Sequence, residues 1–316
     1  MRQAPAQQDA CTVEIKRDGN MAFKKVFIVG AGAVGSCYGA LLSGKNDVTL
    51  IGRQPHVDAV NSGGLAVDGG LKGRFHLNAA TSVSDIPANS LVLLTTKAQD
   101  AAKACEALRP ALRGDTVLLA LQNGVGIKGL IEGAVAGKAR VARGLVLMAA
   151  EFLEPGRVTY WKGPTIIEAT ETGERIRALF EESGLDAEAA PDILTREWDK
   201  MVINCVVNPL SAILRVRDRE VAAPALRGIR RAIIGECASV AAAEGVHLDD
   251  GLAAGIDRRI RSYANYSSMY QDVMKGNDTE IGFLNAKIVE LGGRHGIRAP
   301  VNEALAGMIR FMEAKK

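Results

Sequence analysis

Short apolar runs and longer amphipathic stretches alternate along the first part of the chain. Runs of apolar and β-branched residues predict strands at 24–30, 47–53, 90–97, 116–123 and 140–148. Helical periodicity separates several of them, as in the segments VGSCYGALLSG and AAKACEALRPAL. Continuous apolar strands joined by helices are typical of a parallel sheet covered on both faces. We therefore expect a doubly wound α/β domain, which ends in antiparallel or edge strands at 158–161 and 164–169.

The pattern changes after about residue 190, where strand-like runs give way to helical periodicity over 195–214, 224–245 and 279–291. Pro191 marks the expected boundary, so we predict an α/β domain at 22–190 and an all-α domain at 191–316. A ligand is expected in a cleft between the two domains. Residues 1–20 are polar and lack the apolar core of a signal peptide, so we expect a disordered extension at 1–21.

A GxGxxG motif directly follows the first predicted strand and opens a helix, with the next strand within about thirty residues. The six residues of this expected cofactor loop are Gly30, Ala31, Gly32, Ala33, Val34 and Gly35. In such a loop the first glycine permits a tight turn and the second lets the backbone approach a pyrophosphate. The helix N-terminus then attracts the phosphate charge. A glycine-rich turn without a ligand is the alternative, but the strand–turn–helix context predicts a Rossmann-type dinucleotide-binding domain.

The end of the second predicted strand indicates which nicotinamide cofactor is bound. An NAD site has an Asp or Glu there, which accepts hydrogen bonds from the ribose 2′-hydroxyl. This strand instead ends in Gly52 and Arg53. A guanidinium can hold a 2′-phosphate through charge-assisted hydrogen bonds. We therefore predict that 22–190 binds NADP with the help of Arg53; the alternative is that Arg53 is a solvated surface charge.

Two further predicted strands end in polar residues, Lys97 and Asn123. Ligands of doubly wound sheets bind at the carboxyl edge of the strands, which favours a binding role for both residues. A lysine at a strand end is often only solvated, and Asn-Gly is also an ordinary turn signal. Their occurrence together beside a dinucleotide site favours the binding role.

The segment TREWDKMVINCVVNPLSAIL places Lys200, Asn204 and Asn208 on one face of an otherwise apolar helix. Two carboxamides in such a helix are costly to bury unless they find hydrogen-bond partners. A bound polar ligand would supply those partners; the alternative is a pair of core asparagines bonded to neighbouring backbone. Pro209 is expected to kink the helix just after Asn208 because it removes a backbone donor.

These motifs resemble those of the ketopantoate reductase family (2-dehydropantoate 2-reductases) from about residue 24 to about residue 312. The matching segments, in order, are GAGAVG, TTKAQD, LQNGVG, KMVINCVVNPL, YSSMYQDV and TEIGFLN. The resemblance implies a Rossmann domain followed by a helical domain similar to that of 6-phosphogluconate dehydrogenases. It also implies NADPH-dependent reduction of 2-dehydropantoate, a small 2-oxo acid, to pantoate on the way to pantothenate and coenzyme A.

The resemblance further implies roles for single residues. Lys200 matches the catalytic acid and Glu280 the carboxylate beside the substrate; at its reference pKa of about 10.4 the lysine would be charged at neutral pH. Lys97 and Ala150 match cofactor contacts, and Asn123 matches a contact with both cofactor and substrate. The remaining positions that match substrate contacts are Asn204, Asn208, Asn265 and Ser268.

Three local patterns compete with these implied roles. Glu280 also fits a capping box with Asn277 at the start of the predicted helix, and a carboxylate that caps its helix is less free to meet a substrate. Ser268, after Ser267, also fits an ordinary polar helix start. Asp218 stands where the family often has an Asn that touches substrate. An inward carboxylate would repel the substrate carboxylate, so either Asp218 faces away or the substrate is another 2-oxo acid.

Composition narrows the class of protein. The chain has 316 residues, 47% hydrophobic and 24% charged, which excludes a disordered or low-complexity chain. A net charge of +3 with interspersed charges gives no footprint for nucleic acid or a membrane surface. Five scattered cysteines without a CxxC pair argue against disulfides and metal sites and favour a cytoplasmic protein. No apolar run approaches the roughly 18 residues of a membrane helix.

Three hypotheses follow from the sequence. The first is a pantoate-forming reductase, the second a reductase of the same build acting on another small 2-oxo acid, and the third a non-catalytic NADP-binding regulator. Lys200 and Glu280 argue against a regulator, which needs the glycine loop but no acid beside a ketone. The sequence leaves the oligomeric state open, a homodimer included.

Overall fold

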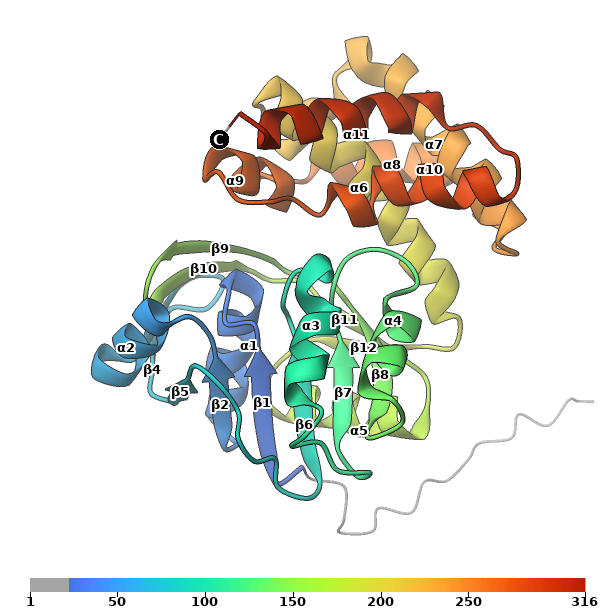
Figure 1. The fold of residues 1–316 in the computed structure, drawn as a ribbon. Helices are drawn as coiled ribbons and strands as arrows, with labels where there is room; N and C mark the ends of the chain where they lie inside the picture. Colours follow the sequence, from blue (N-terminus) through green and yellow to red (C-terminus); the bar gives the residue numbers. More distant parts are fainter. Residues whose placement is uncertain (1–22, 316) are drawn as a thin grey trace, which may run out of the picture.

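The structure is a computed structural model that describes residues 23–315, so the extension expected at 1–21 lies outside the described residues. An eight-stranded sheet forms the centre of the first domain, in the order β12-β11-β8-β7-β6-β1-β2-β5 (Figure 1). Its strands are β1 (Lys25–Val29), β2 (Val48–Ile51), β5 (Asn78–Ala80), β6 (Ser90–Leu94), β7 (Val117–Ala120), β8 (Arg140–Val146), β11 (Thr165–Glu168) and β12 (Ala187–Ala190).

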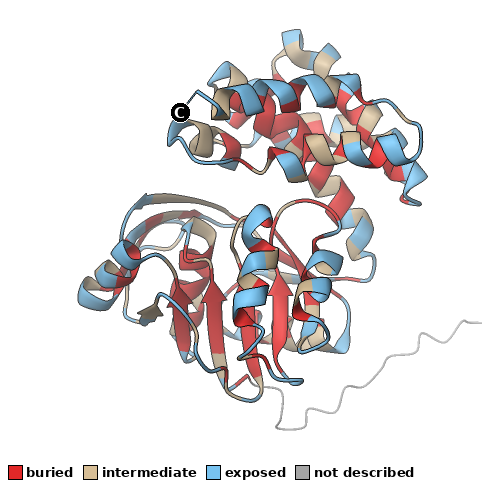
Figure 2. Ribbon diagram, in the orientation of Figure 1, coloured by how far each residue is buried: buried red, intermediate tan, exposed pale blue. Residues whose placement is uncertain are grey.

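Six neighbouring strands are parallel, namely β8, β7, β6, β1, β2 and β5. β11 pairs antiparallel with β8. Helices cover both faces of this sheet: α1 (Ala33–Ser43) and α5 (Glu171–Glu182) pack on one, α3 (Ala98–Leu108) and α4 (Ile127–Val135) on the other. Strands covered on both sides are apolar throughout, and all five residues of β6 are buried (Figure 2). The predicted doubly wound α/β architecture is confirmed.

A second, four-stranded sheet lies beside α1 and was not predicted. Its order is β4-β3-β10-β9, with β3 (Leu65–Gly69), β4 (Gly73–Phe75), β9 (Ala149–Glu154) and β10 (Arg157–Trp161). Helix α2 (Gln54–Gly63) leads into it. The runs expected as neighbouring antiparallel or edge strands therefore belong to different sheets. β10 pairs antiparallel with β9 and parallel with β3, whereas β11 pairs with β8 and β12.

The second domain is helical, as predicted. It consists of α6 (Ile193–Leu214), α7 (Arg227–Ala243), α8 (Leu252–Arg261), α9 (Ser268–Met274), α10 (Asn285–Arg294) and α11 (Pro300–Glu313), with short 3₁₀ turns η1 (Asp218–Ala222), η2 (Pro224–Leu226) and η3 (Ile281–Phe283). Helix α6 packs against α7, α9 and α11 and continues through Pro209 to Leu214. Its central position explains why its apolar residues occur on nearly every side.

The helical domain lies over the carboxyl ends of the parallel strands (Figure 1). The loop after β7 inserts Val125 into the core of the helical domain, and Phe283 of η3 packs against the core beneath α3 and α4. β12 ends at Ala190 and α6 begins at Ile193, and we keep the division between 22–190 and 191–316 as a proposal. Among the described residues, no helix combines the length and the apolar character needed to cross a membrane.

Candidate active site

The glycine loop closes tightly at its ends and is open in the middle. Gly30 has a φ of 106°, and a Cβ there would lie 2.4 Å from the Thr96 nitrogen. A Cβ at Gly35 would lie 2.4 Å from the Gly30 carbonyl oxygen. At Gly32 a Cβ would meet only the Gly30 oxygen, at 4.0 Å, and no side chain caps the N-terminus of α1. An open backbone beside an uncapped helix N-terminus fits an anion such as a pyrophosphate.

Arg53 lies next to this loop. It is the residue before α2, and the preceding Gly52 packs so closely on the loop that a Cβ there would lie 2.8 Å from the Ala31 Cβ. The Arg53 side chain is exposed and makes no hydrogen bond or ion pair with the part of the chain that the structure describes. Its guanidinium is therefore available to an anionic ligand at the end of β2.

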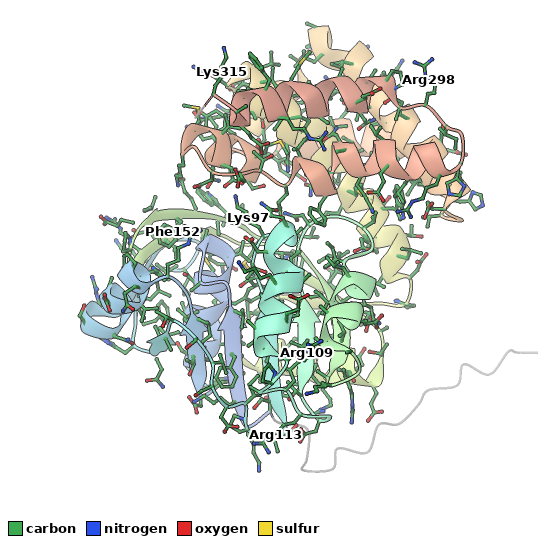
Figure 3. All side chains as sticks on the ribbon, viewed as in Figure 1. Lys97, Arg109, Arg113, Phe152, Arg298 and Lys315 are labelled. Atoms are coloured by element: carbon green, nitrogen blue, oxygen red, sulfur yellow. The ribbon has the colours of Figure 1, made fainter. Side chains whose placement is uncertain are left out.

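Lys97 ends the segment that follows β6 and precedes α3. Its ammonium lies 2.7 Å from the carboxylate of Asp272 in α9 and donates a hydrogen bond to the Asp278 carbonyl oxygen. Figure 3 shows Lys97 at the end of α3 that faces the helical domain. The side chain thus links the two domains, and its contact with the cofactor stays a prediction.

A hydrogen-bonded chain joins three of the predicted site residues across the domain interface. The Lys200 ammonium in α6 donates to Asn123 Oδ1 at 2.8 Å. Asn123 Nδ2 donates to Glu280 Oε2 at 2.8 Å, and the other carboxylate oxygen accepts from the Ala98 N–H at 3.0 Å. Residues 77 and 157 positions apart therefore meet where the helical domain covers the sheet edge.

Glu280 does not cap the helix that follows it in the chain, so the capping-box hypothesis is wrong. The helix predicted from residue 279 is replaced by η3, and α10 begins only at Asn285. Thr279 accepts the Ile281 N–H through its hydroxyl, at 3.2 Å, and its own N–H donates to the Glu313 carboxylate. Because Thr279 takes over the local hydrogen bonding, the Glu280 carboxylate is free to turn toward Asn123.

Burial shifts the pKa values of Lys200 and Glu280. Burial lowers the pKa of Lys200 to about 7, and the positive charge of Arg143 acts in the same direction against the carboxylates of Glu280 and Glu197. Burial raises the pKa of Glu280. The sequence-based expectation used the reference pKa of a solvated lysine, and burial shifts the pKa of Lys200 downward from that value. A pKa close to the operating pH suits a general acid.

Asn204 and Asn208 lie on the same face of α6 as Lys200. Asn208 is only 6% exposed and Asn204 is half-buried, yet neither side-chain amide has a hydrogen-bond partner among residues 23–315. The Ser211 hydroxyl donates to the Asn208 backbone oxygen and leaves the Asn208 side-chain amide unbonded. The alternative that both carboxamides bond to neighbouring backbone is therefore not what the structure contains, and their bonding capacity is open to a ligand.

Asp218 faces the protein interior. It is 3% exposed, its carboxylate accepts from Asn265 Nδ2 at 2.9 Å, and its N–H donates to the Asn265 carbonyl oxygen at 3.2 Å. Burial raises the pKa of Asp218 to about 7. Of the two serines at the start of α9, Ser267 is buried and caps the helix, whereas Ser268 is exposed. Asp218 thus contacts a residue predicted to bind substrate and does not point to solvent.

Two family models match most of the chain. The model described as ketopantoate reductase PanE/ApbA matches residues 26–172, and the model of the ketopantoate reductase PanE/ApbA C-terminal domain matches residues 192–313. The chain belongs to the ketopantoate reductase family. This confirms the resemblance drawn from the sequence motifs.

Relatives in the family match over nearly their full length. The 2-dehydropantoate 2-reductase of Pyrococcus horikoshii is 32% identical over 300 residues, covering 92% of this chain and 98% of the relative. A solved PanE/ApbA family ketopantoate reductase from Ralstonia eutropha is 34% identical, with a TM-score of 0.86 and coverage of 92% and 99%. A D-mandelate dehydrogenase, solved with NADH and anilino(oxo)acetate, is 28% identical with a TM-score of 0.83 and the same coverage.

Sequence reasoning missed three buried polar residues near the interface between the two domains. Arg143 and Glu197 form an ion pair at 2.6 Å, and no periodicity or motif singled out either. Gln122 is 3% exposed, and its Oε1 has no hydrogen-bond partner among the described residues. Gln122 belongs to the LQNGVG segment, where its position next to Asn123 is the only signal that could have indicated it.

Ala150 and the surface hollows of the first domain lie outside the hydrogen-bonded chain of Lys200, Asn123 and Glu280. Ala150 lies in β9 opposite Tyr160 and packs with the core beside α1, and its backbone contact with the cofactor stays a prediction. Two surface hollows of about 380 and 480 Å³ lie on the first domain, lined by residues of α2 and the small sheet among others. Neither includes Lys200, Asn123 or Glu280, so we base the site on the hydrogen-bonded chain.

Proposed function

We propose that this chain catalyses the NADPH-dependent reduction of 2-dehydropantoate to pantoate, the activity named for its relatives in the ketopantoate reductase family. The observation that carries the proposal is the set of hydrogen bonds that joins Lys200, Asn123 and Glu280. These side chains lie at the carboxyl edge of the sheet, which also bears the glycine loop. Doubly wound sheets bind their ligands at this edge. The buried Gln122 oxygen without a partner and the open backbone at Gly32 are consistent with a bound dinucleotide there.

The proposed catalytic residue is Lys200. A nicotinamide dinucleotide, when bound, supplies the hydride that reduces the ketone carbon. Negative charge then develops on the ketone oxygen, and the Lys200 ammonium neutralises it by giving up a proton. Asn123 accepts one Lys200 N–H and so limits the directions in which the ammonium can point. General acid catalysis of this kind contributes about 10²–10⁴ in rate.

Glu280 and the asparagine face of α6 are the proposed substrate contacts. Glu280 is held by Asn123 and the Ala98 N–H, so its remaining lone pairs can accept a hydrogen bond from a substrate hydroxyl. The unbonded carboxamides of Asn204 and Asn208 can donate to the substrate carboxylate or its neighbouring oxygens. Asn265 and Ser268 are proposed to contribute from the start of α9.

The proposed cofactor contacts surround the first βα turn. The backbone of the loop from Gly30 to Gly35 would hold the pyrophosphate, and Arg53 the 2′-phosphate that distinguishes NADPH from NADH. Lys97, Asn123 and Ala150 are proposed as further cofactor contacts.

The experiment is an assay of NADPH oxidation over a panel of 2-oxo acids. 2-Dehydropantoate should have the highest kcat/KM, and Lys200→Ala should abolish most of the turnover while NADPH still binds. If an aromatic 2-oxo acid, such as oxo(phenyl)acetate, has an equal or higher kcat/KM, that acid takes the place of 2-dehydropantoate as the proposed substrate. NADPH binding without oxidation by any member of the panel would support a regulator instead.

A second candidate function is reduction of another 2-oxo acid. The buried Asp218 beside Asn265 favours it, because a carboxylate at that place would repel a substrate carboxylate when ionised. The likeness to a D-mandelate dehydrogenase at 28% identity shows that a protein named for a different 2-hydroxy acid has a similar fold.

A further inference from the structure

Arg143 holds the loop that carries Asn123. It belongs to β8, and its guanidinium is buried below the carboxyl end of β7. One terminal nitrogen donates to the carbonyl oxygens of Ala120 and Gly144, at 2.8 and 2.7 Å. The other donates to the carbonyl oxygens of Gln122 and Gly124, at 2.9 and 3.2 Å.

The last two of these bonds matter for the site. Gln122 and Gly124 flank Asn123, so the Arg143 guanidinium fixes the backbone on both sides of the residue that bonds to Lys200. Four carbonyl oxygens converge on one side chain, and the planar guanidinium can bond to several of them at once because its donors point in fixed directions.

The remaining bond of Arg143 connects this loop to the catalytic helix. Its Nε donates to Glu197 Oε1 at 2.6 Å, and the two side chains are 3% and 9% exposed. Glu197 precedes Lys200 by three residues on α6, which places it about one turn away on the same side of the helix. The ion pair therefore joins the element that carries Lys200 to the element that carries its hydrogen-bond acceptor.

The same pair contributes to the electrostatic environment of Lys200. The charged groups that act on its ammonium are Arg143 from β8, Glu197 from α6 itself and Glu280 from the segment before η3. The positive charge of Arg143 favours the neutral amine, whereas the two carboxylates favour the ammonium. These groups are buried or half-buried, so water screens their interaction less than it would at the surface.

We propose that Arg143 and Glu197 are positioning residues, which set where Asn123 meets Lys200 and how readily Lys200 releases its proton. This inference rests on the proposed role of Lys200 as the proton donor. Neither residue touches the reacting atoms in this arrangement. Both act through the loop, the helix and the charge they place beside the ammonium.

The test measures the titration of Lys200 without relying on turnover. Lysines of the full chain are reductively methylated with a ¹³C label, and the Lys200 signal is assigned by its loss in Lys200→Ala. Glu197→Gln should lower the titration midpoint by about one pH unit, and Arg143→Met should raise it by a similar amount. A residue with only a structural role would not shift the midpoint in opposite directions according to the charge removed.

Two further variants separate charge from position. Arg143→Lys keeps the positive charge but cannot reach all four carbonyl oxygens, so kcat should fall several-fold while the midpoint stays near that of the parent chain. Asp257→Asn is the matched control, because it removes the carboxylate that pairs with another buried arginine, Arg230, at 2.8 Å. It should leave both the midpoint and kcat unchanged.

The outcomes distinguish the two proposals. If Glu197→Gln and Arg143→Met leave the Lys200 midpoint unchanged while Lys200→Ala loses turnover, the positioning inference is wrong and the proposed function stands. If the midpoints move as expected but Lys200→Ala keeps its kcat, the electrostatic link stands and the proposed proton donor is wrong. Should Arg143→Met fail to fold with Glu197 left unpaired, Glu197→Gln alone decides, because it keeps the carbonyl bonds of Arg143.

Discussion

Replacing Asp218 by asparagine should stabilise the fold at neutral and alkaline pH and change it little in acid. The Asp218 side chain is 3% exposed, and burial raises its pKa to about 7 although the hydrogen bond from Asn265 favours the charged form. An asparagine has nearly the same shape and keeps an oxygen that can accept the Asn265 amide hydrogen. The substitution therefore removes the ionisation and puts an amide nitrogen at the place of Oδ1, which has no hydrogen-bond partner among the described residues.

The sign and size of the effect follow from linkage. Asp218 has a higher pKa in the folded protein, about 7, than the ~3.9 of an unfolded chain, so its contribution to stability is complete below pH ~3.9 and is lost as the pH rises through about 7. The loss amounts to about 1.4 kcal/mol per pH unit and reaches about 4 kcal/mol above pH 7. The asparagine side chain does not ionise, so the Asp218→Asn variant would not suffer this loss.

The assay is equilibrium unfolding of the parent chain and of Asp218→Asn between pH 4 and pH 9. The difference in unfolding free energy should be near zero at pH 4 and should grow until about pH 7. At roughly 2–4 °C per kcal/mol, the variant should then melt on the order of 10 °C higher at pH 8. A difference that is the same at pH 5 and pH 8 would refute the argument that Asp218 ionises inside the fold.

The same variant tests repulsion of the substrate. If the ionised Asp218 opposes a substrate carboxylate, Asp218→Asn should increase turnover of 2-dehydropantoate above pH 7, where the parent residue is charged. Steady-state kinetics at pH 6 and pH 8.5 would show whether the gain is confined to the higher pH. A lower KM for 2-dehydropantoate in the parent chain than in Asp218→Asn would contradict the repulsion.

Three other outcomes are expected. Arg53→Ala should weaken NADPH binding far more than NADH binding in a fluorescence titration, and a parent chain that prefers NADH would rule out a 2′-phosphate site at Arg53. Lys200→Ala should lower kcat by about two to four orders of magnitude with cofactor binding intact, whereas Lys97→Ala should raise KM for NADPH or substrate more than it lowers kcat. If the losses are reversed, the two lysines exchange roles. Because the pKa of Lys200 is about 7, kcat/KM for reduction should decline as the pH rises through this value, and a profile flat to pH 9 would exclude Lys200 as the titrating acid.

The sequence was sufficient for the main sheet because burial on both faces demands long apolar runs, such as Ser90–Leu94. It was insufficient for the second sheet, whose short strands are half exposed. β3 contains Asp68 and a terminal glycine, and β4 has three residues, so neither carries a strand-like period. β3 pairs with β10, about 90 positions distant in the chain, and β4 in turn pairs with β3.

The candidate site divides in a similar way. Lys200, Asn123 and Glu280 could be named because each belongs to a segment with a motif, although their chemical roles stay predictions. The pKa of Lys200 could not be predicted, because it depends on burial and on Arg143. The pairing of Arg143 with Glu197 spans 54 positions. Arg143 interrupts the apolar run predicted at 140–148, but nothing in the sequence identifies Glu197 as its partner.

The exchange of Val125 and Phe283 between the two cores has a consequence for recombination of this fold. Each domain completes its interior with a side chain from the other, and the two insertions meet where a Cβ on Gly124 would lie 2.7 Å from the Phe283 oxygen. A helical domain transplanted onto a different Rossmann unit would therefore lack one interior side chain and would expose another. A chimera that retains activity must carry the Asn123–Val125 loop with the helices, or redesign both halves of the exchange.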